Sequence, residues 1–348
     1  MKALVLEAYK ELVYQDVPTP TPAADEVLVR VHACGICGSD VHGWDGSTGR
    51  RIPPLIMGHE ASGVIAALGK NVQGWRVGDR VTFDSTIYRL DDWYTRRGLY
   101  NLSDGRQVLG VSSGEYRRNG AMAEFVTVPQ HILYKLPDEV TFNQAAMVEP
   151  AAVAFHAVEL TPLQLNDGVV VVGAGMIGLC IIQALRLRGC GCIWAIDADP
   201  QRLELAARFG ADRCLRADDD EIAATVRAQT SGRGADAAFE AVGIGASFKT
   251  AISCVRRGAA VTLVGNLSPT VELPLQAVVT QQLRLQGSCA VAGEYPAVLA
   301  QLAAGKIKVN PLISACVPLA EGAEWFERLY RKERGLIKVI LNPNEDNT

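Results

Sequence analysis

Cysteine, basic charge and targeting segments are all scarce in this sequence of 348 residues, and each scarcity excludes a class of protein. The nine cysteines are too few for a disulfide scaffold and odd in number, which favours reduced thiols. The 34 Lys and Arg against 38 Asp and Glu give a net charge of −4, so we expect no nucleic-acid partner. With 49% hydrophobic and 21% charged residues, the composition is that of a globular protein and excludes a disordered chain.

Secretory and membrane-spanning segments are also lacking. The apolar run at residues 3–6 stops at Glu7 and is too short for the hydrophobic region of a signal peptide. The one uncharged stretch long enough to span a bilayer, residues 168–185, is interrupted by Gly173, Gly175 and Gly178. We therefore expect a cytoplasmic protein with no membrane partner.

The pattern of apolar residues changes near residue 150, which together with the length favours two domains. Before that point, short apolar segments separated by Gly, Pro and Asp predict β-strands, followed by a long irregular segment at 83–120. After it, strands alternate with helices, as in a parallel sheet built from βαβ units. The expected strands are 27–31, 61–67, 79–83, 169–172, 192–196, 237–240, 259–264 and 337–341, and the expected helices are 176–187, 200–209, 247–255, 296–303 and 320–331.

The first motif with chemical content is a G-x-G-x-x-G that follows the apolar strand at 169–172. Gly173 permits a tight turn, Gly175 lets the backbone approach a pyrophosphate, and Gly178 lets helix and strand pack closely. Asp197 follows Gly178 by 19 residues and would accept hydrogen bonds from ribose hydroxyls while repelling a 2′-phosphate. The motif therefore predicts NAD rather than NADP, although Arg202, five residues further on, weakens that preference slightly.

Other cofactor contacts are expected beside these glycines and at the ends of the neighbouring strands, where ligands of such sheets lie. Lys338, near the C-terminus, is expected to approach the pyrophosphate. The remaining candidates are Met176, Ile177, Val242, Gly243, Val264, Gly265 and Ser288.

A second group of side chains able to bind a ligand lies between residues 32 and 60. Thiolate, imidazole and carboxylate are all zinc ligands, and a catalytic zinc keeps one position open for water or substrate. From the spacing alone, Cys34-x-x-Cys37 is either a metal pair or a redox pair, because no second Cys-x-x-Cys completes four ligands. The group comprises His32, Cys34, Cys37, Asp40, His42, His59 and Glu60.

In this order, C-G-S-D-V-H at 37–42, G-H-E at 58–60, V-E-P at 148–150 and G-A-G-M-I-G at 173–178 resemble the zinc-dependent medium-chain dehydrogenase/reductase superfamily, and within it the sorbitol (L-iditol) and related polyol dehydrogenases. The resemblance covers essentially the whole chain. It implies an α/β two-domain fold: a GroES-like, mostly β catalytic domain formed by 1–153 and 290–348, and a Rossmann domain, a doubly wound parallel sheet, at 154–289. It also implies a homo-oligomer, a tetramer or a dimer.

The same resemblance assigns metal ligands. Cys37, His59 and Glu60 would hold one catalytic zinc ion per subunit, and Glu149 would bind that ion directly or through water. Asp40 would accept a hydrogen bond from His59 and fix its tautomer.

The reaction implied is oxidation of a secondary alcohol (a polyol, cyclitol or sugar derivative) to a ketone, with hydride transfer to NAD. Ser39 would take the proton of the substrate hydroxyl, and His42 would pass it to solvent. Trp44 and Glu115 are candidate substrate contacts, and Cys34 is expected to be structural.

Two departures from the family pattern stand out. Many members bind a second, structural zinc through four cysteines, and the corresponding positions here are Arg89, Asp92, Thr95 and Ser103. We therefore expect no structural zinc, and an ion pair between Arg89 and Asp92 in its place. Sorbitol-type enzymes also carry an Arg-aromatic pair where residues 287–291 read G-S-C-A-V, so the polar contacts for a sugar chain are reduced.

Two alternative functions remain. One is a zinc-free, NADPH-dependent quinone or enoyl reductase, whose members lack the residues that correspond to Cys37, His59, Glu60 and Asp197. The other is a non-catalytic NAD-binding protein. Metal content separates the first alternative from a zinc dehydrogenase, and turnover on a panel of alcohols separates the second.

Overall fold

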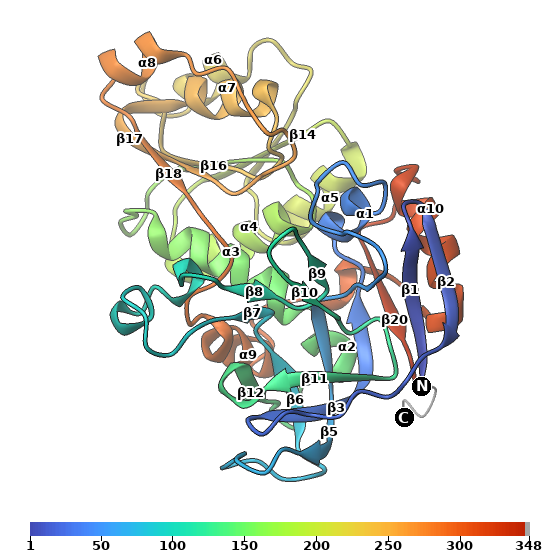
Figure 1. Cartoon of the computed structure of the whole chain (residues 1–348). Helices are drawn as coiled ribbons and strands as arrows, with labels where there is room; N and C mark the ends of the chain where they lie inside the picture. The colour runs from blue at the N-terminus through green and yellow to red at the C-terminus, as the bar shows by residue number, and fades with distance from the viewer. Residues whose placement is uncertain (345–348) are drawn as a thin grey trace. The chain divides into compact units, whose positions relative to one another are not determined.

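The computed structural model describes residues 1–344 and divides the chain into two units. One comprises Met1–Glu149 with Val291–Thr348, and the other comprises Pro150–Ala290. The first boundary therefore lies at 149–150 rather than at 153–154, inside helix α3 (Val148–Leu160). The fold class expected from the sequence is confirmed, because one unit is mostly β and the other contains a parallel sheet with helices (Figure 1).

The first unit is built on a seven-stranded sheet in the order β12-β6-β5-β3-β20-β19, with β11 also paired to β3. The ten-residue β3 is shared: its first half pairs with β11, and its last two residues pair with β20. Gly35, the last residue of β3, therefore pairs with Glu60 at the start of β5 on one side and with Ile340 of β20 on the other. The strands of this sheet are β3 (Glu26–Gly35), β5 (Glu60–Leu68), β6 (Arg80–Phe83), β11 (Phe125–Pro129), β12 (Leu133–Lys135), β19 (Ile313–Pro318) and β20 (Lys338–Asn342).

Smaller elements complete this unit around a core that includes the buried Leu4, Met57, Phe83 and Phe326. A three-stranded sheet has the order β2-β1-β4, and the segment expected to be irregular, 83–120, holds two small antiparallel pairs, β7–β8 and β9–β10. These elements are β1 (Lys2–Ala8), β2 (Glu11–Asp16), β4 (Leu55–Ile56), β7 (Thr86–Ile87), β8 (Gln107–Val108), β9 (Val111–Ser112), β10 (Arg117–Arg118), α1 (Gly38–Gly43), α2 (Phe142–Ala145), α9 (Tyr295–Ala303) and α10 (Gly322–Tyr330).

The second unit contains a six-stranded, fully parallel sheet in the order β15-β14-β13-β16-β17-β18. Strand order reverses at β13, so the carboxyl ends of β13 and β16 form the switch point where such sheets bind ligands. Its strands are β13 (Val169–Val172), β14 (Ile193–Asp197), β15 (Arg213–Arg216), β16 (Ala235–Glu240), β17 (Val255–Leu263) and β18 (Arg284–Gly287), and its helices after α3 are α4 (Met176–Arg188), α5 (Pro200–Arg208), α6 (Ile222–Ala228), α7 (Gly245–Cys254) and α8 (Leu275–Thr280).

None of the helices in the described part of the chain combines the length and the apolar character needed to cross a membrane. The uncharged stretch at 168–185 is instead divided between the buried strand β13, a turn and the first part of α4. The glycines of that turn account for the division.

The glycine turn between β13 and α4 places different demands on its residues. A Cβ atom at Gly178 would lie 1.7 Å from the carbonyl oxygen of Gly173, so no larger residue fits without moving the backbone. A Cβ atom at Gly175 would meet only Arg202 Nη1, at 3.9 Å. Gly178 is thus required for the fold itself, and Gly175 is not.

Gly178→Ala is expected to lower the free energy of unfolding by about 1–3 kcal/mol, the usual effect of overpacking a tight contact. Gly175→Ala should have a smaller effect on stability, yet it should weaken dinucleotide binding, because its methyl group would lie where the backbone approaches the pyrophosphate. Thermal unfolding followed by circular dichroism and NAD titration measure the two effects. Equal losses of stability in both variants would contradict this assignment.

Candidate functional site

Three residues of the first unit bring potential metal ligands together. One ligand atom each from Cys37, His59 and Glu60 lies within 4.8 Å of the other two, and this is the one such group of His, Cys, Asp and Glu side chains found among residues 1–344. The sheet explains the meeting, because Gly35 at the end of β3 pairs with Glu60 at the start of β5. The structure therefore assembles the ligands expected from the C-G-S-D and G-H-E motifs.

Cys37 is the N-cap of helix α1, and its sulfur is surrounded by donors. The backbone N–H of Ser39 lies 3.5 Å from the Cys37 Sγ atom, and the Ser39 hydroxyl lies 3.3 Å from it. Cysteine binds metals through its thiolate sulfur.

His59 and Asp40 face each other in the interior. His59 Nδ1 and Asp40 Oδ2 are 3.4 Å apart, within ion-pair distance, and neither atom has a hydrogen-bond partner in the described part of the chain. Burial opposes charge on both groups, but the pKa of Asp40 is held well below its usual value by His59 and Arg51, and that of His59 is raised by Asp40 and Cys37. Nδ1 is thereby committed to Asp40, as expected, which leaves Nε2 for a metal.

Arg51 is the further partner of Asp40, and the motif analysis did not assign it that role. Its Nε and Nη2 atoms lie 2.9 and 2.7 Å from Asp40 Oδ1, and both side chains are buried. An arginine eleven residues after Asp40, next to a second arginine at position 50, carries no sequence signal for this contact.

Glu60 is paired with Lys338. Lys338 Nζ donates to both Glu60 carboxylate oxygens, at 2.9 and 2.6 Å, and to the Ile36 carbonyl oxygen at 3.0 Å. Burial would lower the pKa of Lys338, but Glu60 and Cys37 raise it. This ammonium group is buried and makes three hydrogen bonds within the first unit, and its expected contact with the cofactor pyrophosphate stays a prediction.

Glu149 lies in the first turn of α3, outside the group of three ligands but within its electrostatic reach. Burial raises the pKa of Glu149 to about 7, with His59 opposing the shift and Glu60 adding to it. A cation at this site would favour the ionised form of Glu149, as expected of a metal ligand that binds directly or through water.

The remaining residues predicted around the substrate are dispersed. Ser39 is exposed beside Cys37, and His42, in the last turn of α1, has a pKa lowered by burial and by Lys332. Glu115 is exposed on the turn between β9 and β10, and its role stays a prediction. Trp44 is 6% exposed.

The placement of Trp44 corrects the expectation that it contacts substrate. Its ring lies edge-on to Tyr330, with centroids 5.2 Å apart, and is tilted against Phe326 at 6.5 Å. Trp44 therefore packs α1 against α10 and belongs to the core of the first unit.

The second unit positions Asp197 beside the glycine turn. Asp197 Oδ2 accepts a 2.7 Å hydrogen bond from the Ala174 N–H, and Oδ1 accepts one of 2.8 Å from the Asp199 N–H. Arg202 approaches Asp197 Oδ2 only to 3.9 Å. Helix α4 begins at Met176 and Ile177, two of the predicted cofactor contacts, and continues to Arg188. Its N-terminus lies next to the fixed Asp197 carboxylate along the chain's glycine turn, as the dinucleotide-binding motif requires.

Glu240, which the motif analysis did not single out, organises two other strand ends. Its carboxylate accepts hydrogen bonds from the backbone N–H groups of the turn after β16, at 2.8–3.0 Å, and its carbonyl oxygen accepts from the turn after β17. Ser288 follows β18, and its buried hydroxyl has no partner within residues 1–344. The predicted cofactor contacts whose backbone N–H groups donate to Glu240 are Val242, Gly243, Val264 and Gly265.

Two family descriptions match the chain: "Alcohol dehydrogenase GroES-like domain" over residues 23–138 and "Zinc-binding dehydrogenase" over residues 177–304. The sorbitol dehydrogenase of Bacillus subtilis (strain 168) is 31% identical, over 99% of this chain and 98% of that enzyme. The (R,R)-butanediol dehydrogenase of the same organism is 30% identical, over 99% and 100%. The chain belongs to the zinc-dependent medium-chain dehydrogenase/reductase superfamily.

Solved structures agree with this membership. Alcohol dehydrogenase TADH from Thermus sp. ATN1 is similar with a TM-score of 0.91 and 33% identity, over 98% of this chain and 99% of that one. As a superfamily member the protein is an oxidoreductase, a zinc-dependent alcohol or polyol dehydrogenase, and the resemblance drawn from the motifs is confirmed.

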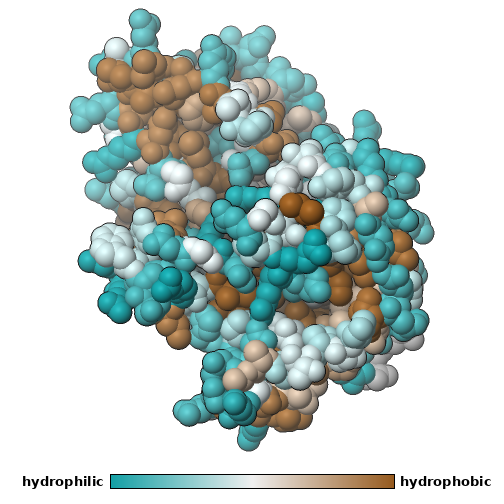
Figure 2. Space-filling view, viewed as in Figure 1, coloured by the Kyte–Doolittle hydropathy of each residue, from teal (hydrophilic) through white to brown (hydrophobic). Residues whose placement is uncertain are grey.

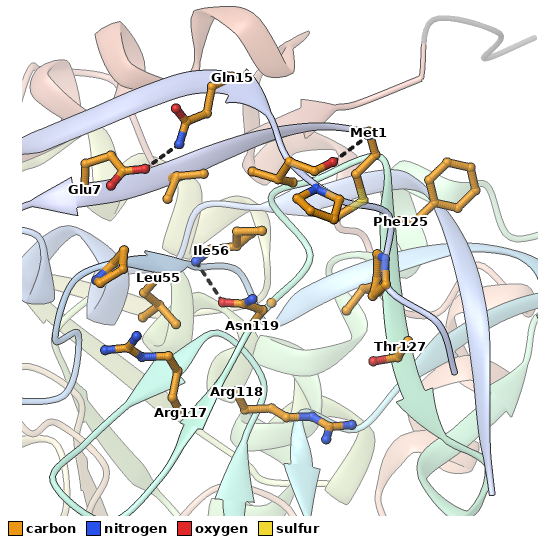
Figure 3. A pocket seen from close by; sticks show the side chains of 17 residues that line it. Met1, Glu7, Gln15, Leu55, Ile56, Arg117, Arg118, Asn119, Phe125 and Thr127 are labelled. Carbon is orange, nitrogen blue, oxygen red and sulfur yellow. Dashed lines mark hydrogen bonds between the residues drawn. The ribbon is translucent and has the colours of Figure 1, made fainter. Parts of the chain in front are cut away.

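A cavity of about 500 Å³ in the first unit is separate from this site. Figure 3 shows Glu7 and Gln15 hydrogen-bonded to each other on one side of it, with Arg117, Asn119 and Phe125 also in its lining. None of the metal-ligating residues lines it.

In the lobe where many superfamily members bind structural zinc, Asp92 is the central residue. Its carboxylate accepts hydrogen bonds from the Thr95 N–H at 2.7 Å, the Asp104 N–H at 3.0 Å and the Ser103 hydroxyl. The Arg89 N–H donates in turn to Ser103 Oγ at 3.1 Å. Burial would raise the pKa of Asp92, but these hydrogen bonds lower it to about 2. The four positions at which many superfamily members carry the zinc-binding cysteines, residues 89, 92, 95 and 103, are thus connected by hydrogen bonds around the Asp92 carboxylate.

The expected ion pair between Arg89 and Asp92 is wrong. The Arg89 guanidinium group lies 3.4 Å from Asp91 Oδ1, and both side chains are exposed. Asp92 points into the lobe instead, where backbone N–H groups replace the arginine as its partners.

Asp92→Ala should open the lobe locally, because three hydrogen bonds to an ionised acceptor are lost together. We expect limited proteolysis within residues 88–104 to become roughly tenfold faster, since cleavage follows the population of the open form. Asp91→Ala, which removes only an exposed ion pair, is the matched control and should behave as wild type. Equal proteolysis of Asp92→Ala and Asp91→Ala would remove Asp92 from this role.

Proposed function

We propose that this chain oxidises a secondary alcohol to a ketone with NAD, using a zinc ion held by Cys37, His59 and Glu60, with Glu149 as an additional ligand, direct or through water. The observation that carries the proposal is the group of three ligand atoms within 4.8 Å of one another. Thiolate, imidazole and carboxylate suit zinc. The commitment of His59 Nδ1 to Asp40 supports the same conclusion, because it orients the ring with Nε2 available.

The chain's own residues then have distinct roles. Bound zinc would supply Lewis-acid polarisation of the substrate oxygen. Ser39, exposed beside Cys37, takes the substrate hydroxyl proton as it releases its own toward His42, and the half-buried His42 passes a proton to solvent. Asp40 holds the orientation of His59. Bound NAD would supply the acceptor for the hydride.

Asp197 and the glycine turn support NAD over NADP. The Asp197 carboxylate is fixed by two backbone N–H groups, so it remains in place to accept from ribose hydroxyls. Its negative charge disfavours a 2′-phosphate, and Arg202 at 3.9 Å offsets that charge only in part.

The substrate class follows from the similar proteins and from one departure. Sorbitol and butanediol, the substrates in the names of two relatives, both carry secondary hydroxyl groups. The G-S-C-A-V segment at 287–291 lacks the Arg-aromatic pair of sorbitol enzymes, which favours a polyol, cyclitol or sugar derivative other than sorbitol. The hydrogen-bonded network of Asp92 supports a structural lobe without zinc.

We also propose that the chain forms a homo-oligomer, a dimer or a tetramer, through the second unit. Within residues 1–344, strand β18 pairs only with β17, and α8 buries none of its residues. Leu275 and Val279 on α8 are 61% and 66% exposed, and Figure 2 shows hydrophobic residues gathered at the top left, where Figure 1 places α8. An open sheet edge beside an apolar patch is typical of a symmetric interface.

Zinc content and activity test the proposed reaction together. Protein purified without chelator should contain about one zinc per chain and oxidise secondary alcohols, with a higher kcat/KM for NAD than for NADP. Cys37→Ala should lose the zinc and nearly all activity but retain NAD binding. Two zinc ions per chain would contradict the metal-free lobe, and turnover without metal would favour a zinc-free reductase. A zinc- and NAD-binding chain inactive on every alcohol would favour a non-catalytic role.

Sedimentation velocity tests the proposed interface. The wild-type chain should sediment as a dimer or tetramer, and Val279→Asp should shift it toward the monomer, because a charge would be buried in an apolar contact. Leu165→Asp is the matched control, since Leu165 is 83% exposed in the same unit but lies outside α8. A monomeric wild type, or an equal shift in both variants, would refute the interface.

A further inference from the structure

One guanidinium group contacts two different parts of the proposed catalytic apparatus. Arg51 Nη2 lies 2.7 Å from Asp40 Oδ1 and also 3.3 Å from Ser39 Oγ, while Nε lies 2.9 Å from the same Asp40 oxygen. Asp40 faces the metal ligand His59, and Ser39 is the proposed proton acceptor. No other role has been given to this arginine, whose side chain is 4% exposed.

The fold provides a dedicated place for Arg51. A Cβ atom at Gly43, the last residue of α1, would lie 2.3 Å from Arg51 Cγ, so the stem of the arginine fills the space that glycine leaves. Its backbone is held by hydrogen bonds of the flanking residues to Ser112 on β9, and its Nη1 atom donates to the Arg50 carbonyl oxygen at 3.1 Å. Backbone and guanidinium are therefore both fixed.

The contact with Asp40 determines which carboxylate oxygen is available to His59. Two donors from Arg51 occupy Oδ1, which leaves Oδ2 to face His59 Nδ1 at 3.4 Å. A two-atom arginine contact fixes the plane of the carboxylate, whereas a lysine would supply a single point of charge. The orientation of the imidazole, and hence of the metal-binding nitrogen, depends on that plane.

The contact with Ser39 restricts the hydroxyl group. A serine oxygen has two acceptor sites and one proton, and Arg51 occupies one acceptor site at 3.3 Å. The Ser39 hydroxyl also lies 3.3 Å from Cys37 Sγ. One acceptor site is then left free for a substrate hydroxyl.

We propose that Arg51 is a positioning residue that aligns the metal ligand His59, through Asp40, with the proton-accepting hydroxyl of Ser39. The second part of this inference rests on the proposed dehydrogenase function, and the first does not. Arg51 is not one of the proposed metal ligands, so it acts on the metal site through Asp40 and on proton transfer through Ser39.

The test compares Arg51→Met and Arg51→Lys with Arg118→Met. Arg118 also forms an ion pair in the first unit, with Glu26 at the start of β3, the opposite end of that strand from Gly35 and Glu60. We expect Arg51→Met to weaken zinc binding by about 10–100-fold, the usual effect of losing a residue that orients a metal ligand. Arg51→Lys should lie between Arg51→Met and wild type, and Arg118→Met should bind zinc as wild type does.

Three measurements separate positioning from general stability. Competition with a chromophoric chelator gives the zinc affinity, and the visible spectrum of the cobalt(II)-substituted protein reports the geometry of the thiolate and imidazole ligands. Steady-state kinetics should give a lower kcat with little change in the KM for NAD. Wild-type zinc affinity and cobalt spectrum in Arg51→Lys and in any folded Arg51→Met would overturn the proposal.

Asp40→Asn completes the design and covers the case in which Arg51→Met does not fold. If Arg51 orients His59 through Asp40, the double variant Asp40→Asn/Arg51→Met should bind zinc no worse than Asp40→Asn, and it leaves no unpaired buried charge. If the double variant instead lost zinc affinity by the product of the two single-variant losses, the link through Asp40 would be refuted. If the wild type oxidises no alcohol, the proposed function fails, while zinc affinity and the cobalt spectrum still decide the link between Arg51 and His59.

Discussion

Pairing of buried charge is the constraint on which this site depends. Two acidic side chains, Asp40 and Glu60, lie in the interior beside the thiol and imidazole, and each contacts one buried cation, Arg51 or Lys338. Removing one partner of such a pair generally costs about 3–5 kcal/mol, because it leaves an unpaired charge in a poorly solvated place. The site therefore requires both ion pairs to form when the chain folds. For the second pair the sheet brings the partners together, because Glu60 is the first residue of β5 and Lys338 is the first residue of β20.

The same pairing decides what remains for a metal. Arg51 is bonded to Asp40 and Lys338 to Glu60, so neither cation forms its ion pair with the buried carboxyl group of Glu149. The pKa of Glu149, about 7, means that burial and Glu60 together make it the acid most readily left protonated near neutral pH. A divalent cation supplies the charge that this arrangement lacks.

The parts of the site that could be predicted from the sequence are those that depend on local spacing. Cys37 and Asp40 lie on one short helix, and the glycine turn and its helix follow β13 directly, so their chemistry appears as a compact motif. The partners could not be predicted in this way. Arg51 is separated from Asp40 by 11 residues and Lys338 from Glu60 by 278, and both contacts depend on the packing and register of other elements. The sequence therefore carries no local signal for the contact of Lys338 with Glu60.

The structural lobe shows why choosing among neighbouring charges is harder than finding a motif. Asp91 and Asp92 are both close enough in sequence to pair with Arg89, and charge complementarity alone does not distinguish them. The backbone does, because it turns Asp92 toward the N–H groups of Thr95 and Asp104 and leaves Asp91 in solvent with the arginine. A buried carboxylate gains more from several fixed N–H donors than from one mobile, hydrated guanidinium. Asp40 also binds donors that are already held in position. Its partner is Arg51, whose guanidinium group is buried and fixed, unlike the exposed one of Arg89.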